Sequence, residues 1–187
     1  MIAPPVTRKR FTTREYEQII AAGVIAEDDR VELLEGEIVE MSPIGPSHSA
    51  CIDRLNQLLQ RMVGDSAIVR VQSPIRLSEY SAPQPDLTLL QPRHDFYASG
   101  HPEPEEILLL IEVSESSLSY DRAVKLPLFA LAGIPEVWIV ALLPQVIEVY
   151  RSPGENGYGE TQTLRRGDSL SAINLPELAL IVDSVLG

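Results

Sequence analysis

The sequence is short of several features that particular classes of protein require. Its 187 residues include a single cysteine, Cys51, so the chain can form neither an internal disulfide nor a cluster of thiolate metal ligands. Cys51 falls in an expected helix, where it is most simply a small buried apolar residue. No P-loop or dinucleotide-binding fingerprint is present. Disulfide scaffolds, thiolate clusters and a fused nucleotide-driven energy source are therefore excluded.

Long apolar runs are also missing. The two longest, residues 107–111 and 137–143, fall well short of the ~20 residues that a helix needs to cross a bilayer. Residues 1–5 contain no charged segment followed by an apolar one, which a secretory signal would have. We therefore expect a cytoplasmic protein.

Positive charge is scarce. The chain has 15 Lys and Arg against 27 Asp and Glu, a net charge of −12. Proteins that cover themselves with nucleic acid normally cluster Lys and Arg, so this balance argues against such a protein. A site that holds a divalent cation, however, must itself be acidic. Basic residues occur locally, and ordinary solvated charge explains each of them equally well: Arg8 to Arg10, Arg54, Arg61, Arg70, Arg76, Arg165 and Arg166.

What is present fits one globular domain. Hydrophobic residues make up 44% of the chain, and a chain of this size buries roughly 70% of the surface that its unfolded form exposes. There is no internal repeat and no low-complexity tail. We expect a single domain over residues 1–187, with residues 1–10 as a flexible arm.

Residue spacing predicts an alternating pattern of helices and strands. Helices are expected over residues 12–23, 46–64 and 119–131. Thr12 and Glu15 have capping-box spacing at the first helix, and Pro127 predicts a late start or a kink in the third. Strands are expected at 30–34 and 37–41 around a turn, and at 67–72, 75–77, 86–90, 107–114, 137–142 and 146–151. This order predicts an α/β sheet core covered by helices.

Two segments are expected to lack regular structure. Residues 91–104, rich in Pro, His and Gly, are expected to form a loop, and residues 152–159, rich in Gly, a turn or a flexible loop. His94 and His101 lie in the first of these loops, where exposure to solvent is the simpler expectation than a role as metal ligands. Residues 160–187 are expected to form a short hairpin and a packed terminal segment.

The most informative residues are two acids at the ends of buried strands. Asp86 follows Pro85, and Glu112 ends the apolar run 107–111. A charge at the edge of an apolar core is costly unless a cation binds it, so the pair suggests a metal. A simpler alternative for Asp86 is to cap the turn after Pro85. Glu112 interrupts an otherwise apolar strand, which is hard to explain structurally.

A lysine follows on the next expected helix. Asp121 and Lys125 are spaced i, i+4, so Lys125 can point toward the same end of the sheet as the acids. Two acids and a lysine are the parts of a phosphodiester-cleaving site. The alternative is an ordinary pair on the helix surface between Asp121 and Lys125, worth ~0.3–0.5 kcal/mol.

An ordered set of segments resembles the Uma-two family, a branch of the restriction-endonuclease-like superfamily with its Pro-Asp…Asp/Glu-x-Lys pattern. Each segment alone is weakly diagnostic, but their order over nearly the whole chain is specific. The segments are 30–43, His48, Pro85-Asp86, 111–114, Tyr120-Asp121-Arg122 with Lys125, and 133–140.

The resemblance implies a mixed α/β (α+β) sheet core flanked by helices, and a metal-dependent endonuclease acting on DNA. It implies that Asp86 and Glu112 bind Mg²⁺ or Mn²⁺, and that Lys125 positions the attacking water and offsets developing charge. It also brings Glu32 near the site, although Glu35 and Glu37 are close enough in sequence to be confused with it. His48 would contact a phosphate or the metal's water, and its alternative role is that of a capping or surface residue. A homodimer would place two such sites to cut two strands.

One position departs from the superfamily pattern. The lysine usually lies two residues after the second acid, and that position is Ser114 here. The departure and the acidic charge leave a second hypothesis open, in which the domain keeps the nuclease fold but works as a binding or assembly module. A glycosidase built on the two acids ranks last, because 5% aromatic residues leave few rings to stack on sugars.

Overall fold

The computed structural model describes residues 7–26 and 28–187. Of the arm expected over residues 1–10, residues 1–6 therefore lie outside the described part, and residues 7–10 have no helix or strand. No helix in the described ranges is long and apolar enough to cross a membrane.

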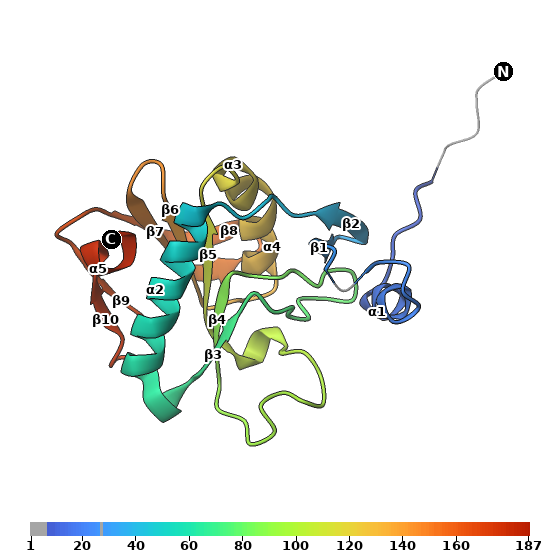
Figure 1. The fold of residues 1–187 in the computed structure, drawn as a ribbon, viewed down its shortest axis with the longest axis horizontal. Coiled ribbons are helices and arrows are strands. Elements are labelled where there is room, and N and C mark those ends of the chain that lie inside the picture. Colours follow the sequence, from blue (N-terminus) through green and yellow to red (C-terminus); the bar gives the residue numbers. More distant parts are fainter. Residues whose placement is uncertain (1–6, 27) are drawn as a thin grey trace.

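A six-stranded mixed sheet forms the centre of the molecule, with the order β3-β4-β5-β6-β7-β8 (Figure 1). Neighbouring strands are antiparallel except β5 and β6, which are parallel. The strands are β3 (Ile68–Val71), β4 (Leu87–Leu90), β5 (Ile107–Ser114), β6 (Glu136–Ala141), β7 (Val146–Gly154) and β8 (Gly157–Leu164). The predicted mixed α/β core is confirmed.

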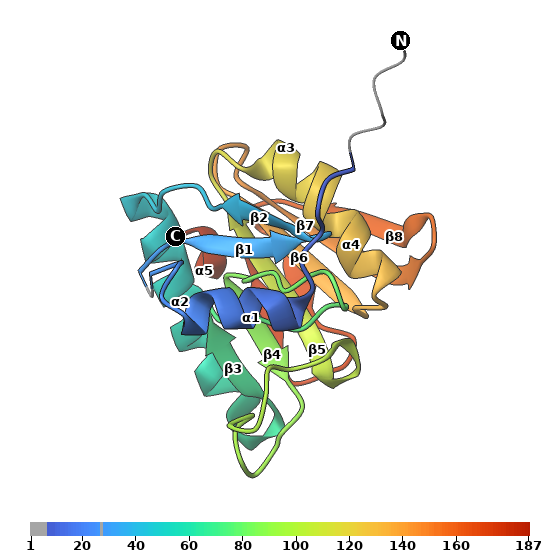
Figure 2. The same cartoon turned by 90° about the vertical axis from the view of Figure 1, so that its right-hand side faces the viewer.

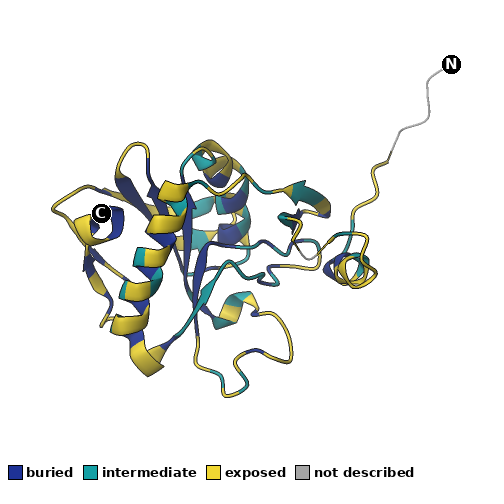
Figure 3. Ribbon diagram, in the orientation of Figure 1, coloured by how far each residue is buried: buried dark blue, intermediate teal, exposed yellow. Residues whose placement is uncertain are grey.

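Helices cover both faces of this sheet, because the central strands are apolar on both sides (Figure 3). One face of β5 carries Leu109, Ile111 and Val113, which pack with the helix α2 (Pro46–Val63). The other face carries Leu110, which belongs to a second core with Phe129 of α4 (Leu126–Leu131). Alternation along the strand places Glu112 on the same face as Leu110. Glu112 therefore faces the helical connection between β5 and β6.

That connection is one continuous helical segment. It consists of α3 (Leu118–Tyr120), a π-helical turn η3 (Asp121–Lys125) and α4. The N–H of Leu126 donates to the carbonyl of Asp121, five residues back, and Pro127 has no N–H to donate. The expected late start or kink at Pro127 is therefore replaced by a widened turn directly before it. Such turns are frequent at functional sites.

The N-terminal elements lie over one end of the sheet (Figure 2). Helix α1 (Thr13–Ala21) begins with the predicted capping box, in which Thr12 Oγ1 accepts from the N–H of Glu15 and the Glu15 carboxylate accepts from the N–H of Thr12. The predicted hairpin forms from β1 (Val31–Leu34) and β2 (Glu37–Glu40). Gly36 in its turn has φ +84°, and a Cβ there would lie 2.6 Å from Arg10 Cβ.

The C-terminal part packs against α2. Strands β9 (Ser169–Ser171) and β10 (Ala179–Ile181) form a separate two-stranded sheet, followed by α5 (Val182–Leu186). Arg54 of α2 donates to the carbonyls of Val185 and Leu186 at 3.2 and 2.8 Å. Two short 3₁₀ turns complete the described elements, η1 (Gly64–Ser66) and η2 (Pro104–Glu106).

Two predicted boundaries were wrong. Residues 75–77 form no strand, because the preceding Pro74 cannot donate a ladder hydrogen bond and only isolated bridges form nearby. The expected loop over 152–159 is instead largely the β7–β8 hairpin, with a left-handed Ser152 at φ +59° bending β7. His94 and His101 are exposed, as expected.

Candidate active site

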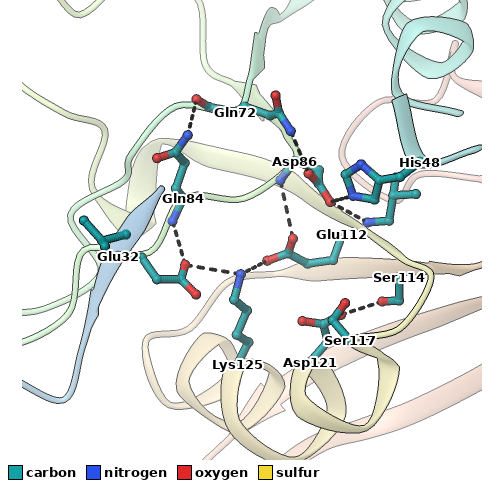
Figure 4. A network of polar contacts seen from close by, with 12 residues as sticks. Glu32, His48, Gln72, Gln84, Asp86, Glu112, Ser114, Ser117, Asp121 and Lys125 are labelled. Atoms are coloured by element: carbon teal, nitrogen blue, oxygen red, sulfur yellow. Dashed lines mark hydrogen bonds and ion pairs between the residues drawn. The ribbon is translucent and has the colours of Figure 1, made fainter. Parts of the chain in front are cut away.

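A cavity of about 300 Å³ lies at the end of the sheet where β4 begins and β5 ends. It reaches the surface beside Ile44 and Tyr120, which are 38% and 36% exposed. Side chains from β1, α2, β5 and the helix after β5 point into one shared region (Figure 4). All five residues predicted for the site line the cavity: Glu32, His48, Asp86, Glu112 and Lys125.

Asp86 is 6% exposed and is held from three directions. Its Oδ2 lies 3.1 Å from Nε2 of His48 and accepts from the N–H of Val113 at 2.9 Å. Its Oδ1 accepts from the side-chain amide of Gln72 at 3.3 Å. These contacts join Asp86 to α2, to the segment after β3 and to β5 rather than to its own turn, so the turn-capping alternative does not describe it. The hydrogen bond to Asp86 raises the pKa of His48.

Glu112 lies beside Asp86 and is 4% exposed. Its Oε2 is 3.4 Å from the backbone N of Asp86, and its Oε1 accepts from Nζ of Lys125 at 3.1 Å. Burial raises the pKa of Glu112 well above its ordinary value, and the nearby Asp86 carboxylate adds to the rise while Lys125 opposes it. A buried carboxylate with a raised pKa holds its charge only when further positive charge is supplied.

Lys125 occupies the space between two glutamates. Its ammonium lies 3.1 Å from Glu112 and 3.2 Å from Glu32 Oε2, and the residue is 5% exposed. Burial alone would lower the pKa of Lys125, but the carboxylates of Glu112 and Glu32 outweigh burial and raise it. Lys125 is therefore a fixed cation inside the site.

The alternative of a surface pair between Asp121 and Lys125 is wrong, because both residues are buried. Oδ2 of Asp121 accepts from the hydroxyls of Ser114 and Ser117 at 2.6 and 2.7 Å. Ser114, at the usual lysine position, thus holds Asp121 in place. Lys125 brings its ammonium to the second acid from the helix, by way of the π-helical turn.

Two glutamines were missed from the sequence. The N–H of Gln84 donates to Glu32 Oε2 at 3.1 Å, and its side-chain amide donates to the carbonyl of Gln72 at 2.8 Å. Gln72 in turn donates to Asp86, which completes a path from Glu32 to Asp86. Gln84 directly precedes Pro85-Asp86, so its position was a signal that could have been used. Gln72 lies in no motif, and its left-handed φ of +44° is visible only in the structure.

The charges of the site do not balance. Four buried carboxylates, those of Glu32, Asp86, Glu112 and Asp121, line the cavity together with one ammonium, that of Lys125. Buried charges without partners are costly, so such an excess calls for a further cation. His48 adds a ring whose Nδ1 is buried and has no hydrogen-bond partner in residues 7–26 and 28–187.

Asp86 and Glu112 fit a hard divalent cation. No group of three or more His, Cys, Asp or Glu side chains within the described ranges is arranged to hold a metal ion. Mg²⁺ does not need one, because it is typically bound through one or two carboxylates and completes its shell with water and substrate phosphate oxygens. Two adjacent carboxylates at the wall of an open cavity match that requirement.

Comparisons with known proteins give the family and the fold of the chain. The family model Uma2, described as "Putative restriction endonuclease", matches residues 13–183. A crystal structure described as "a putative nuclease belonging to DUF820" from Anabaena variabilis ATCC 29413 is similar, with a TM-score of 0.72 and 18% sequence identity. The similarity covers 94% of this chain and 97% of that one, and at this identity it shows a shared fold. The comparison with curated proteins found no match.

Proposed function

The chain belongs to the Uma2 family of restriction-endonuclease-like proteins, and on that premise we propose that it is a metal-dependent nuclease that hydrolyses phosphodiester bonds in DNA. One observation carries the proposal. A buried ammonium, that of Lys125, lies within 3.2 Å of two carboxylates in the cavity that Asp86 also lines. Acid, acid and lysine thus meet at one cavity, although they come from three separate segments of the chain.

Asp86 and Glu112 would hold the metal, Mg²⁺ or Mn²⁺. When bound, such a cation would polarise a phosphoryl oxygen and lower the pKa of a water. His48 and Gln72 orient Asp86 through both of its oxygens, which fixes the direction of the carboxylate before any ligand arrives. Supporting contacts of this kind usually matter nearly as much as the ligands themselves.

Lys125 would act on the phosphate directly. Its compact cationic group is suited to orienting a water and to offsetting negative charge that develops on the phosphate oxygens. Glu32 keeps the ammonium in place from the side opposite Glu112 and favours its charged form. We propose that His48 orients Asp86, and that Glu32 positions Lys125.

The hypothesis of a binding or assembly module rests on the net charge of −12 and on the serine at position 114. Lys125 lies in the interior beside Glu112 and not in solvent. This position favours the enzyme. Burying a lysine among acids costs free energy of folding, and a catalytic role for Lys125 explains why the cost is met. We further propose a homodimer, since cutting both strands of a duplex needs two sites.

The test is cleavage of supercoiled plasmid DNA in Mg²⁺ or Mn²⁺. We expect cleavage by the wild type, none in EDTA, and loss of cleavage in Asp86→Asn, Glu112→Gln and Lys125→Gln. The matched control for one lost carboxylate is Glu177→Gln, because Glu177 is exposed and does not line the cavity. Circular dichroism of each variant checks the fold. Cleavage in EDTA, or wild-type rates in all three site variants, would contradict the mechanism.

A further inference from the structure

A second cavity, of about 550 Å³, lies away from the acidic site. It is bounded by α1, the segment that follows β3, and the end of the 91–104 loop. Three of its side chains are basic and one is acidic, in a chain whose net charge is −12. The polar residues that line it include Glu17, Arg70, Ser73, Arg76, Ser99 and His101.

Arg76 has hydrogen-bonding capacity left over. Its Nη2 donates to Glu17 Oε1 at 3.0 Å, and the side chain is 42% exposed. Its Nε, however, is buried and has no hydrogen-bond partner in the part of the chain that the structure describes. Buried donors without partners are rare, and each needs an explanation. The exposed part of the guanidinium remains open to an acceptor that enters the cavity.

Arg70 is held in place before any ligand binds. Its Nη2 donates to the carbonyl of Phe96 at 3.0 Å, and its guanidinium lies 5.4 Å from the ring centre of Tyr97. Phe96 and Tyr97 both have left-handed backbones, with φ of +49° and +62°. This conformation is uncommon for aromatic residues and persists only where surrounding contacts enforce it. Arg70 therefore presents a fixed guanidinium at the cavity.

The loop that carries these residues is itself anchored. Arg93 bonds to Asp95 at 2.6 Å and to Glu106 at 3.1 Å, and its guanidinium lies 4.2 Å from the Tyr97 ring centre. The hydroxyl of Ser99 donates to Asp95 at 2.9 Å. Arg93 is thus neutralised by its own acids, whereas Arg70 and Arg76 together have one acid between them at the cavity, Glu17.

One segment of the chain connects the two sites. Gln72 holds Asp86 of the acidic site, and the next residue, Ser73, lines the basic cavity. A chain with a net charge of −12 repels a polyanion overall, so local basic residues are needed to attract one. Arg70 and Arg76 are such residues.

We propose that the basic cavity binds a backbone phosphate of the nucleic-acid strand whose cleavage is proposed above, an inference that rests on that proposed function. Two guanidinium groups, those of Arg70 and Arg76, offer forked donors that match phosphate oxygens. Contacts to phosphate position a strand without reading its sequence. The cavity therefore contributes affinity and register, not sequence specificity.

The experiment measures binding of short fluorescein-labelled DNA and RNA oligonucleotides to the full chain by anisotropy, in EDTA so that cleavage plays no part. We expect the double variant Arg70→Gln/Arg76→Gln to bind both about 10-fold or more weakly. We also expect the slope of log affinity against log salt to become shallower by about 1 for each phosphate that the variant no longer binds. The matched control is Arg61→Gln/Arg165→Gln, two exposed arginines that line neither cavity.

A second measurement does not depend on a variant folding. Inorganic phosphate titrated into the ¹⁵N-labelled wild type should shift the Nε–H signals of Arg70 and Arg76 and leave that of Arg61 unchanged. Saturating shifts by phosphate without oligonucleotide binding would assign the cavity to free phosphate and overturn the nucleic-acid proposal.

Three further outcomes would overturn the proposal: equal affinity in the double variant, an equal loss in the control, or no binding by the wild type. Because binding is measured without metal, failure here leaves the plasmid-cleavage test of the nuclease untouched. Failure of cleavage, conversely, leaves the arginine dependence of binding measurable.

Discussion

Three neighbouring strands of the sheet each carry a buried glutamate, and the surroundings of the three differ. Glu136 of β6 is fully buried and accepts from Arg151 at 2.7 Å, from Trp138 Nε1 at 2.8 Å and from the N–H of Ile173 at 2.8 Å. Glu148 of β7 pairs with Arg122 and accepts from the hydroxyl of Tyr150 at 2.7 Å. Glu112 of β5 shares one ammonium with Glu32 and lies against Asp86.

The difference shows which property of a buried acid indicates function. Glu112 and Glu148 interrupt apolar strands and Glu136 begins one, so an acid in an apolar strand does not by itself mark a site. Glu136 and Glu148 are each matched by an arginine, which is how a structural carboxylate is normally kept in the interior. Glu112 belongs to a group in which acids outnumber cations. An unmatched surplus of charge, and not burial, separates the candidate site from the structural pairs.

The largest expected effect separates the activity of Glu112 from its role in stability. Glu112→Gln should lower the rate of plasmid cleavage by about 10³-fold, since it removes a carboxylate from the site where charge is stabilised. The same change removes one surplus negative charge, so the free energy of unfolding without metal should stay equal or rise. Urea denaturation measures the second quantity. A clear loss of stability would place Glu112 with the structural glutamates.

The opposite pattern is expected at Glu136. Glu136→Ala should cost about 3 kcal/mol of unfolding free energy, because it leaves the Arg151 guanidinium and the Trp138 N–H without their acceptor. Cleavage per folded molecule should not change, since Glu136 does not line the acidic cavity. Denaturation and cleavage assays on the same preparation check both parts. A specific loss of activity with full stability would break the contrast between the two glutamates.

A smaller effect, on metal affinity, is expected at Gln72. Its side chain is not an acid but donates a hydrogen bond to Asp86. Gln72→Gly removes the amide that orients Asp86 but permits the φ of +44°, so the fold should be kept. We expect metal affinity to fall about 10- to 100-fold. Gln72→Asn is the matched variant, because it keeps an amide and tolerates a left-handed backbone. Wild-type metal affinity in Gln72→Gly would remove Gln72 from the site.

The smallest effect concerns the pair of Glu148 and Arg122. Burial would raise the pKa of Glu148, but hydrogen bonds from Arg122 and Tyr150 outweigh it and lower the pKa below its usual 4.5. A lowered pKa adds stability above the unfolded pKa, and that stability is lost as the pH falls through the folded value. Arg122→Gln should therefore cost about 1 kcal/mol near pH 7, where the 45% exposure of Arg122 limits the effect.

The control for this prediction is the same comparison in acid. Urea denaturation at about pH 3 should show a smaller difference between wild type and Arg122→Gln than at pH 7. An equal difference at both values would mean that Arg122 stabilises the fold through packing and not through the charge of Glu148.

Much of the fold was predictable from local patterns, since apolar runs such as 107–114 and the Thr12–Glu15 capping box act over short distances. The five candidate residues were named from the sequence and lie around one cavity. Their electrostatic balance could not be predicted, because it depends on which strand face meets which helix. The π-helical turn that places Lys125, and the left-handed Gln72, arise from backbone geometry that no motif records. The partners of Glu136 and Glu148 likewise come from distant segments.

The surplus of carboxylates in the cavity that Lys125 lines should hold a divalent cation. Isothermal titration calorimetry of Mg²⁺ and Mn²⁺ into the wild type, Asp86→Asn, Glu112→Gln and Glu136→Gln measures this binding. We expect saturable binding by the wild type and Glu136→Gln, and loss of that binding in Asp86→Asn and Glu112→Gln. Absence of binding by the wild type, or equal affinity in all four proteins, would contradict it.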